Sequence, residues 1–363
     1  MSTSPAPREI GFRYGTSPSS LTDEAYYNDG IAVASGSYSV DISSLSPSTT
    51  YYYEAFMMVS DGNGGFKEIT SSVGSFTTPA AGTVSSGFLA CYEVPAIGNL
   101  SGSGTSGTFT ERDDTWYRYY TTNSKQQLAT HTYKHPSTNK QVRNYTVLYD
   151  GSKYAPLWTA HVMHASMWPD KNVGRNEEWV SDPAINLTQQ SGLDNASTVG
   201  YSRGHLVASD YRQSSVKQNK QTFYYSNQAP QWQNGFNSGV WSTLEGKVKA
   251  AAPSGRDTLY VVTGVLYEGT VKTLSSGSLS VPIPSHFYKC LMKCSFDASG
   301  TMTAASGTAF IFTNESHTGE QYNDQRYIST IDAIEQRAGF DFFPNVPSSL
   351  QTNAENGTSV LNL

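Results

Sequence analysis

The sequence is poor in cysteine, in charge and in long apolar runs, and each shortage excludes a class of protein. Only 3 of the 363 residues are cysteine, too few for a disulfide-stabilised scaffold. No stretch approaches the ~18 consecutive apolar residues of a membrane-spanning helix. Charged residues make up 15% and the net charge is −6, which argues against a strongly basic nucleic-acid binder. Because 37% of the chain is hydrophobic, disorder is excluded as well.

The cysteines and the first residues of the chain indicate in which compartment the protein works. Cys290 and Cys294 lie four residues apart in a strand-like run, ~13 Å if extended, which exceeds the ~7 Å limit for a disulfide. Any bridge would therefore involve Cys91. The first ten residues contain no apolar export signal, but the Ser, Thr and Tyr content suits an exported protein whose signal peptide was removed. We expect a secreted, periplasmic or cell-surface protein.

The acidity is concentrated at the front of the chain. Residues 1–79 contain 3 Lys or Arg and 8 Asp or Glu, which leaves 21 and 22 for residues 80–363. Within residues 200–260 the balance reverses, with seven basic residues against three acidic ones, a local +4. A polyanion can therefore bind there although the whole molecule is acidic.

Alternating apolar and polar residues predict β-strands in the front segment. They lie at 9–14, 36–42, 50–57 and 73–78. Leu45, Pro47, Thr49 and Tyr51 match the L-x-P-x-T-x-Y corner of fibronectin type III domains. In that corner a Tyr hydroxyl ties a strand to the preceding connection. Residues 1–79 resemble such a domain, an all-β sandwich that is incomplete because the resemblance begins at the usual third strand. We expect an interaction or spacer module.

The rest of the chain divides into a linker and a second domain. Small polar residues over 80–110 indicate a Gly/Ser-rich linker, interrupted by one apolar patch at 88–95. Residues 111–363 mix strand-like apolar runs with two helical stretches. The strands are expected at 145–149, 157–163, 258–263, 287–292 and 308–312, and the helices at 239–252 and 330–338. This mixture is typical of an α+β domain.

Two interpretations compete for the polar residues that follow position 200. Gly200, Ser202 and Gly204 form a literal G-x-S-x-G motif, which in α/β-hydrolases places a nucleophilic serine after a buried strand. The preceding residues, 194–199, are small and polar, and the βαβ alternation of that fold is missing, so the context does not fit. The second interpretation takes His205 as the catalytic residue.

Hydrolysis of a phosphodiester needs a base, a cation and a positive group for the phosphate oxygens. A histidine, an Asn or Glu with a hard metal ion, and an arginine supply these. Asn237, Trp241 and Glu245 are spaced by four, so that the last two share one face of a helix beginning near Gly239. An Asn oxygen suits Mg²⁺, which keeps most of its water ligands.

A set of motifs recurs in order along the second domain. They are Tyr201 to His205, Asn227 with Pro230 and Gln231, Asn237 to Glu245, Val262 to Tyr267, and Ile334 to Phe343. This set resembles the DNA/RNA non-specific endonucleases of the ββα-metal superfamily over about residues 140–345. The resemblance implies an α+β nuclease domain with a central antiparallel sheet and a ββα-metal motif, which cleaves DNA and RNA to 5′-phosphate products.

The resemblance also assigns roles to single residues. His205 would be the general base, and Asn237 the direct protein ligand of Mg²⁺, in whose place Mn²⁺ or Ca²⁺ would also fit. Glu245 would hold a metal-bound water. These three residues are the expected centre of the site.

Further residues of the resemblance support that centre. Asn227 would support the histidine and the phosphate-side network, and Arg203 would anchor the motif. Upstream, Arg175, followed by Trp179 and Asp182, resembles the segment whose arginine contacts the scissile phosphate. Arg175 is therefore expected to bind substrate.

Three features depart from the family pattern. Ser202 stands where the motif usually has Asp before Arg-Gly-His, so a carboxylate that orients metal waters is replaced. Lys249 occupies a position where arginine is common. Its ammonium is a point charge, whereas the planar guanidinium of arginine binds two oxygens at once. The loop from Gln231 to Asn237 is one residue longer than usual.

Simpler interpretations of the same residues stay open. Asn237 could be only a helix N-cap, and Trp241 a core residue. His161 and His164 have a spacing that suits zinc, but no Cys, Asp or Glu accompanies them. For the whole protein, the alternatives are a non-catalytic polyanion-binding or adhesive surface module and a hydrolase of another phosphodiester or ester.

Overall fold

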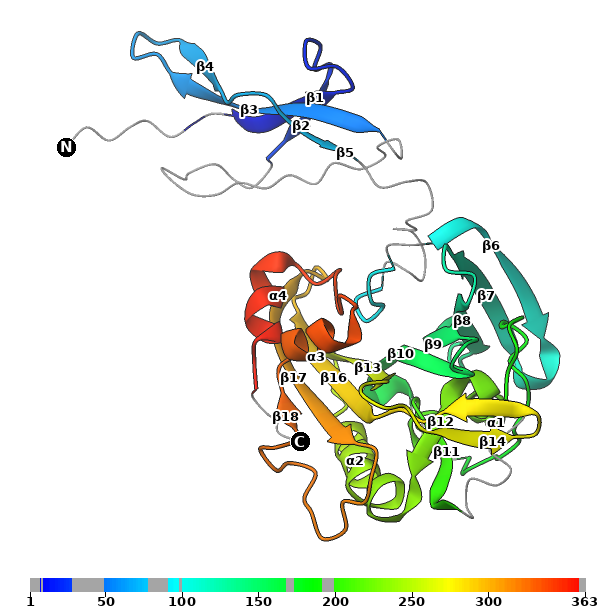
Figure 1. Ribbon diagram of the computed structural model, residues 1–363. Coiled ribbons are helices and arrows are strands. Elements are labelled where there is room, and N and C mark those ends of the chain that lie inside the picture. Colours follow the sequence, from blue (N-terminus) through cyan, green and yellow to red (C-terminus); the bar gives the residue numbers. More distant parts are fainter. Residues whose placement is uncertain are drawn as a thin grey trace. The chain divides into compact units, whose positions relative to one another are not determined.

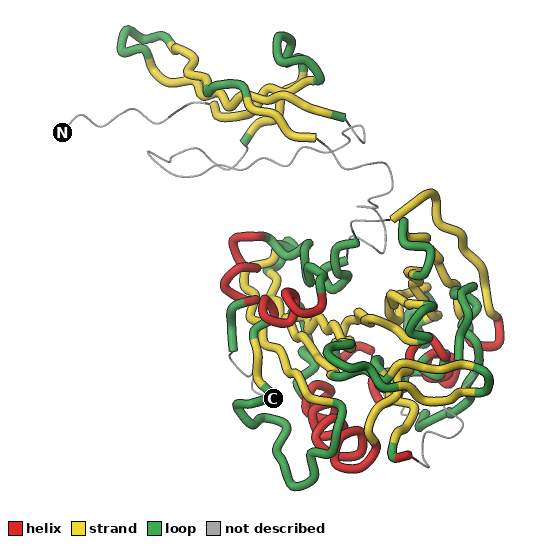
Figure 2. The backbone as a smooth tube through the Cα atoms, viewed as in Figure 1, coloured by secondary structure: helices red, strands yellow, loops and turns green. Residues whose placement is uncertain are grey.

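The computed structural model describes residue 7 and residues 9–27, 49–77, 91–97, 100–167, 173–190 and 199–358. The chain divides into two compact units, Met1–Thr83 and Val84–Leu363 (Figure 1). Strands form most of the regular structure in both units (Figure 2). Among the described residues, no helix is long and apolar enough to cross a membrane.

The described part of the first unit is a single antiparallel sheet in the order β2-β1-β3-β4, with β5 also paired to β3. Its strands are β1 (Glu9–Gly15), β2 (Asp23–Tyr26), β3 (Thr50–Ser60), β4 (Phe66–Thr70) and β5 (Gly74–Thr77). The predictions at 9–14, 50–57 and 73–78 correspond to β1, β3 and β5. The predicted strand 36–42, and the corner up to Pro47, lie outside the described residues. The fibronectin type III-like sandwich therefore stays a prediction.

The second unit is built on a nine-stranded antiparallel sheet in the order β18-β17-β16-β13-β10-β9-β8-β7-β6. The strands are β6 (Leu100–Phe109), β7 (Asp114–Thr121), β8 (Gln126–Lys134), β9 (Gln141–Asp150), β10 (Ala155–Met163), β13 (Thr258–Leu266), β16 (His286–Phe296), β17 (Met302–Thr313) and β18 (Ile328–Ser329). The antiparallel sheet with few helices, implied by the resemblance, is confirmed. The stretch predicted as a linker contributes β6, because its small residues pair with β7.

Helices cover both faces of this sheet (Figure 1). One face packs on α3 (Ile331–Ala338) and α4 (Ser348–Glu355), and this core includes Trp158 and Tyr288. The other face packs on α2 (Ser242–Ala250), with Trp241 and Phe287 in its core. The predicted helices at 330–338 and 239–252 correspond to α3 and α2, although α2 is shorter because the backbone before it is irregular.

Shorter elements surround the sheet on the α2 side. They are helix α1 (Val216–Gln221), the hairpin of β11 (Tyr201–His205) with β12 (Gln228–Trp232), and the hairpin of β14 (Thr273–Ser276) with β15 (Leu279–Pro282). The three cysteines are free, as the distance argument predicts for Cys290 and Cys294. The β11–β12 hairpin contains the motif around His205.

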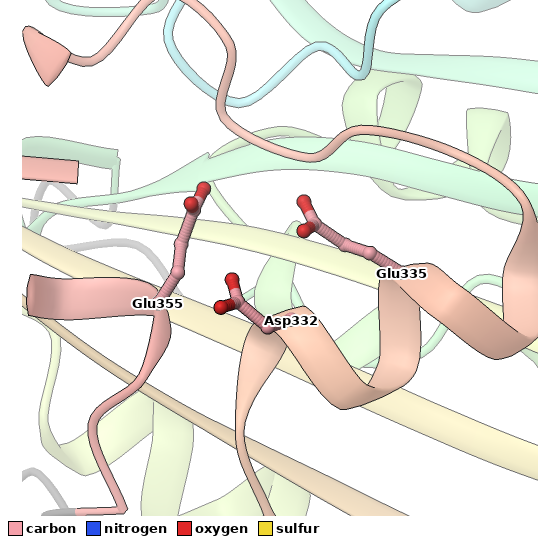
Figure 3. Close-up of side chains that lie close together, drawn as sticks. All are labelled: Asp332, Glu335 and Glu355. Carbon is pink, nitrogen blue, oxygen red and sulfur yellow. The ribbon is translucent and has the colours of Figure 1, made fainter. Parts of the chain in front are cut away.

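Three carboxyl groups meet between α3 and α4 (Figure 3). Asp332, Glu335 and Glu355 place their oxygens within 4.8 Å of one another. The Phe342 N–H donates to Glu335 Oε1 (2.5 Å), and the Gln351 amide donates to Glu355 Oε1 (2.9 Å). Burial, together with the neighbouring carboxylates, raises the pKa of Glu335 to about 7 and the pKa of Glu355 to about 8.

Candidate active site

His205 ends β11 and lies in an aromatic pocket. Its ring centroid is 4.9 Å from that of Trp179 and 5.0 Å from that of Phe223. Its Nε2 is buried and has no hydrogen-bond partner among the described residues. Burial, assisted by the Arg175 cation and opposed by Glu177, lowers the pKa of His205 to about 3. The imidazole is therefore neutral at pH 7 and can accept a proton.

The glycine before His205 is required by the hairpin. A Cβ on Gly204 would lie 2.4 Å from Cβ of Gln231 on the paired strand β12. Asn227, at the end of the turn that precedes β12, is fully buried. It accepts from the Val207 N–H (2.9 Å) and donates to the carbonyl oxygens of Val207 (3.0 Å) and Thr222 (2.8 Å). Asn227 thus fixes the chain immediately after His205, whereas its predicted role in the phosphate-side network stays a prediction.

Asn237 lies in an irregular helical segment, η7 (Gln233–Trp241), just before α2. Gly235 has a φ of 78°, and a Cβ there would lie 2.6 Å from the Thr318 nitrogen, so only glycine fits this kink. The Asn237 Nδ2 donates to Ser202 Oγ (3.0 Å) and to Gln233 Oε1 (2.9 Å). Its Oδ1 accepts no hydrogen bond from the described residues. No side chain caps α2, so the N-cap interpretation of Asn237 is wrong.

Ser202 has a clear structural role at the position where Asp is usual. Its hydroxyl accepts from Asn237 and donates to the Gln231 carbonyl oxygen (3.2 Å). Ser202 and His205 are three residues apart in β11, so ~10 Å of strand separates them. The two central residues of the prediction, His205 and Asn237, are therefore tied to the same five-residue strand.

Glu245 lies one turn into α2 beyond the core residue Trp241. Its Oε1 is buried without a hydrogen-bond partner among the described residues. Burial raises the pKa of Glu245 to about 7, while the Lys289 ammonium and the Trp241 indole oppose that rise. Lys289 is fully buried on β16 and donates to Thr263 Oγ1 (2.8 Å). The pKa of Glu245 therefore lies close to neutral pH, so that both its protonated and its ionised form are populated there.

Arg175 reaches the site from an irregular segment, residues 173–190. Its Nε donates to Glu177 (3.1 Å), one terminal nitrogen donates to Ser209 Oγ (3.2 Å), and the guanidinium lies 4.8 Å from the Phe223 ring centre. Half of the side chain is exposed. Its charge acts on both His205 and Glu245, so it lies near the two groups that the prediction links to catalysis.

The second unit is similar in sequence to known proteins. The family model described as DNA/RNA non-specific endonuclease matches residues 124–349, more than half of the chain. The chain belongs to this family. As a DNA/RNA non-specific endonuclease family member it is a nuclease, and nucleases of this family generally depend on a divalent metal.

Similar proteins include other nucleases. A nuclease of Nostoc sp. (strain PCC 7120 / SAG 25.82 / UTEX 2576) is 29% identical over 62% of this chain and 81% of its own length. Human mitochondrial endonuclease G is 26% identical over 57% of this chain and 70% of its own length. A chain in the crystal structure of the EndoG/EndoGI complex aligns with a TM-score of 0.47 and 24% identity, over 56% of this chain and 84% of that chain.

The remaining predicted residues of this family member fall around the same centre. Arg203 packs its guanidinium 5.6 Å from the Trp179 ring centre, on the segment that carries Arg175. Lys249 forms an ion pair with Asp210 (2.8 Å). Its charge is therefore already neutralised by a carboxylate in this structure.

The competing interpretations of two motifs do not fit the structure. Ser202 lies inside strand β11 and bonds to Asn237, not at a sharp turn between a strand and a helix, so the serine-hydrolase interpretation fails. His161 is buried in the sheet, whereas His164 bonds to Ser166 in the following turn (2.7 Å). These two histidines do not form a zinc site, because no further ligand type joins them in the described residues.

The sequence interpretation missed several residues that the structure brings to the site. Glu177 binds both Arg175 and the Trp179 indole (2.8 Å), and Phe223 packs against His205. Lys289 comes from β16, 44 positions after Glu245 in the sequence. Of these residues, only Glu177 could have been identified from the sequence, because it stands two residues from Arg175 in the motif.

Proposed function

We propose that the protein is a Mg²⁺-dependent endonuclease that hydrolyses DNA and RNA to 5′-phosphate products, with His205 as general base. The observation that supports this most directly is the buried His205 Nε2, which has no hydrogen-bond partner among the described residues and lies near the Arg175 cation. A neutral ring can take a proton from the attacking water.

The donor atoms of the site fit a hydrated divalent ion. Asn237 Oδ1 and Glu245 Oε1 accept no hydrogen bond from the described residues, and both are hard oxygen donors. Asn237 would hold the ion directly and Glu245 would bind one of its waters. A Mg²⁺ ion held there would supply positive charge for the scissile phosphate and for the leaving 3′-oxygen.

The chain's own residues position the substrate. Arg175 presents a half-exposed guanidinium, whose planar fork suits two phosphate oxygens. Glu177 and Ser209 hold that guanidinium from one side. Contacts of this kind are made to the backbone, which explains cleavage with little dependence on base sequence.

The decisive test is cleavage of plasmid DNA and of RNA by the wild type and by His205→Ala, with and without EDTA. Loss of the base is expected to lower turnover by about 10²–10⁴-fold, and EDTA is expected to abolish cleavage. His164→Ala, the same change outside the site, serves as control and retains activity. Cleavage that survives EDTA would contradict the metal mechanism, and binding without cleavage would favour the adhesive alternative.

For the first unit we propose an interaction or spacer module of a secreted, periplasmic or cell-surface protein. Its described residues include no histidine. The bond network of Arg13 with Glu24 (3.0 Å) and Glu68 only ties its strands together.

A further inference from the structure

The segment 173–190 surrounds His205 but contains almost no regular structure. Arg175 and Trp179 come from this segment. Its backbone makes few hydrogen bonds to the rest of the unit, namely the Val180 N–H to Phe223 (3.1 Å), the Tyr225 N–H to Val180 (3.0 Å) and the Val173 N–H to Gln213 (3.3 Å). Side-chain contacts therefore contribute much to the position of this segment.

A buried histidine joins this segment to the sheet. His131 on β8 is fully buried, and its Nδ1 lies 2.9 Å from Asp114 Oδ2 on β7. Its Nε2 lies 2.9 Å from Oδ2 of Asp182, a residue of the segment. Both carboxylates are buried as well.

The pattern of hydrogen bonds favours a charged His131. Asp114 Oδ2 also accepts from the Tyr224 hydroxyl (3.0 Å), and Asp182 Oδ2 also accepts from the Ser226 hydroxyl. With both carboxyl groups ionised, both ring nitrogens of His131 donate to them. Only the imidazolium has two N–H donors.

We propose that His131 is a positioning residue of the nuclease site: as a buried imidazolium it fixes, through Asp114 and Asp182, the two segments that enclose His205. One is the Trp179 segment. The other is the turn of residues 222–227, in which Phe223 contacts His205 and Asn227 holds the backbone after it. This proposal rests on the proposed nuclease function.

The surroundings of His131 favour its charged form well beyond neutral pH. Burial disfavours the charge, but Asp182 and Asp114 outweigh it and raise the pKa of His131 to about 10. The other titratable or charged groups packed around it are Tyr145 on β9, Tyr224, and Arg112, whose guanidinium lies 5.0 Å from the Tyr224 ring centre. Because the folded pKa is raised, the stabilisation is complete below pH ~6.5 and is lost as the pH rises through about 10.

Asp114→Asn in the full chain is the sharpest variant, because it removes one carboxylate and touches no residue that contacts substrate. The kcat/KM of the wild type is expected not to fall between pH 7 and pH 9. The variant is expected to lose at least about tenfold over that interval, because the pKa of His131 falls with one partner removed. Hydrogen exchange at pH 8 should be faster in residues 173–190 and unchanged in β13 and β16.

Thr130→Val is the matched control. Thr130 is the buried neighbour of His131 on β8 and bonds to Thr146 (2.9 Å), away from the segment. This variant should show the wild-type pH profile and exchange. A folded Asp114→Asn protein with that same profile and exchange would overturn the proposal.

A second measurement needs no variant. In ¹⁵N-histidine-labelled wild type at pH 8, one ring should show two slowly exchanging N–H signals, as an imidazolium does. A spectrum with only neutral rings would also overturn the proposal. Since neither this spectrum nor hydrogen exchange requires cleavage, failure of the nuclease function itself is distinguished from failure of the His131 role.

Discussion

Glu245 is the residue at the site whose charge responds most readily to neutral pH. Its carboxyl group is buried, and of the cations that act on it Lys289 has the largest effect; the Lys289 Nζ lies 4.7 Å from the centre of the Trp241 indole. Burial also lowers the pKa of Lys289, and Glu245 opposes that change. The Lys289 ammonium therefore favours the ionised form of Glu245, and the Glu245 carboxylate favours the ionised form of Lys289.

A rise in activity through neutrality is therefore expected. If ionised Glu245 is the active form, wild-type kcat/KM increases about tenfold per pH unit below its pKa of about 7 and levels off above it. Glu245→Gln should lose this limb and be about 10–100-fold less active at pH 8. The measurement is kcat/KM from pH 5.5 to 8.5, with Glu268→Gln as a surface control. An unchanged acid limb in Glu245→Gln would exclude this role.

Sequence alone identified the residues that lie in continuous motifs. His205, Asn227, Asn237 and Glu245 were named from such motifs, and their roles stay a prediction. His131, Asp114 and Asp182 could not be predicted as a group, because the pairing of β7 with β8 and the path of the segment 173–190 bring them together. Such contacts depend on register, which no local pattern specifies.

At the scale of elements, the packing of α3 against α4 concentrates negative charge. Glu335 and Glu355 have raised pKa values, so the folded state favours their protonated forms. Their contribution to stability is therefore greatest below the unfolded pKa and is lost as the pH rises through about 7 to 8. The contact between the two helices should weaken in mildly alkaline solution.

Glu355→Gln should reverse part of this loss. At pH 9 we expect the variant to melt about 2–4 °C above the wild type, the shift produced by ~1 kcal/mol in a domain of this size. At pH 5 the two melting temperatures should agree. The measurement is thermal unfolding followed by circular dichroism, and the exposed Glu111→Gln is the control. A lower melting temperature of Glu355→Gln at pH 9 would refute the electrostatic explanation.

Elements with long apolar runs were predictable, and short polar ones were not. The predicted strands at 145–149, 258–263 and 287–292 correspond to β9, β13 and β16, which are buried on both faces. The β11–β12 hairpin gave no alternating pattern, because its residues are mostly polar, and only the resemblance to the ββα-metal nucleases implied it. Leu100–Phe109 was assigned to a linker from its Gly and Ser content, yet it forms a strand because β7 supplies a partner.

On the scale of the whole molecule, the second unit contains its own cores. All four buried hydrophobic clusters of the described residues lie in it, between Val94 and Ala354. A chain of residues 84–363 should therefore fold alone and cleave an oligonucleotide with kcat/KM within about twofold of the full chain. Kinetics and calorimetry of both chains check this. A tenfold loss would show that the first unit takes part in cleavage.

The composition of β6 also affects the behaviour of the molecule in concentrated solution. Among the described residues, β6 is an outermost strand, with one row of backbone amides and carbonyls that has no neighbouring strand in the sheet. Long, flat, hydrophobic edge strands pair with strands of other molecules and so promote aggregation. An edge rich in glycine, serine and threonine offers little hydrophobic surface for such pairing, so we expect the second unit to resist self-association at high concentration.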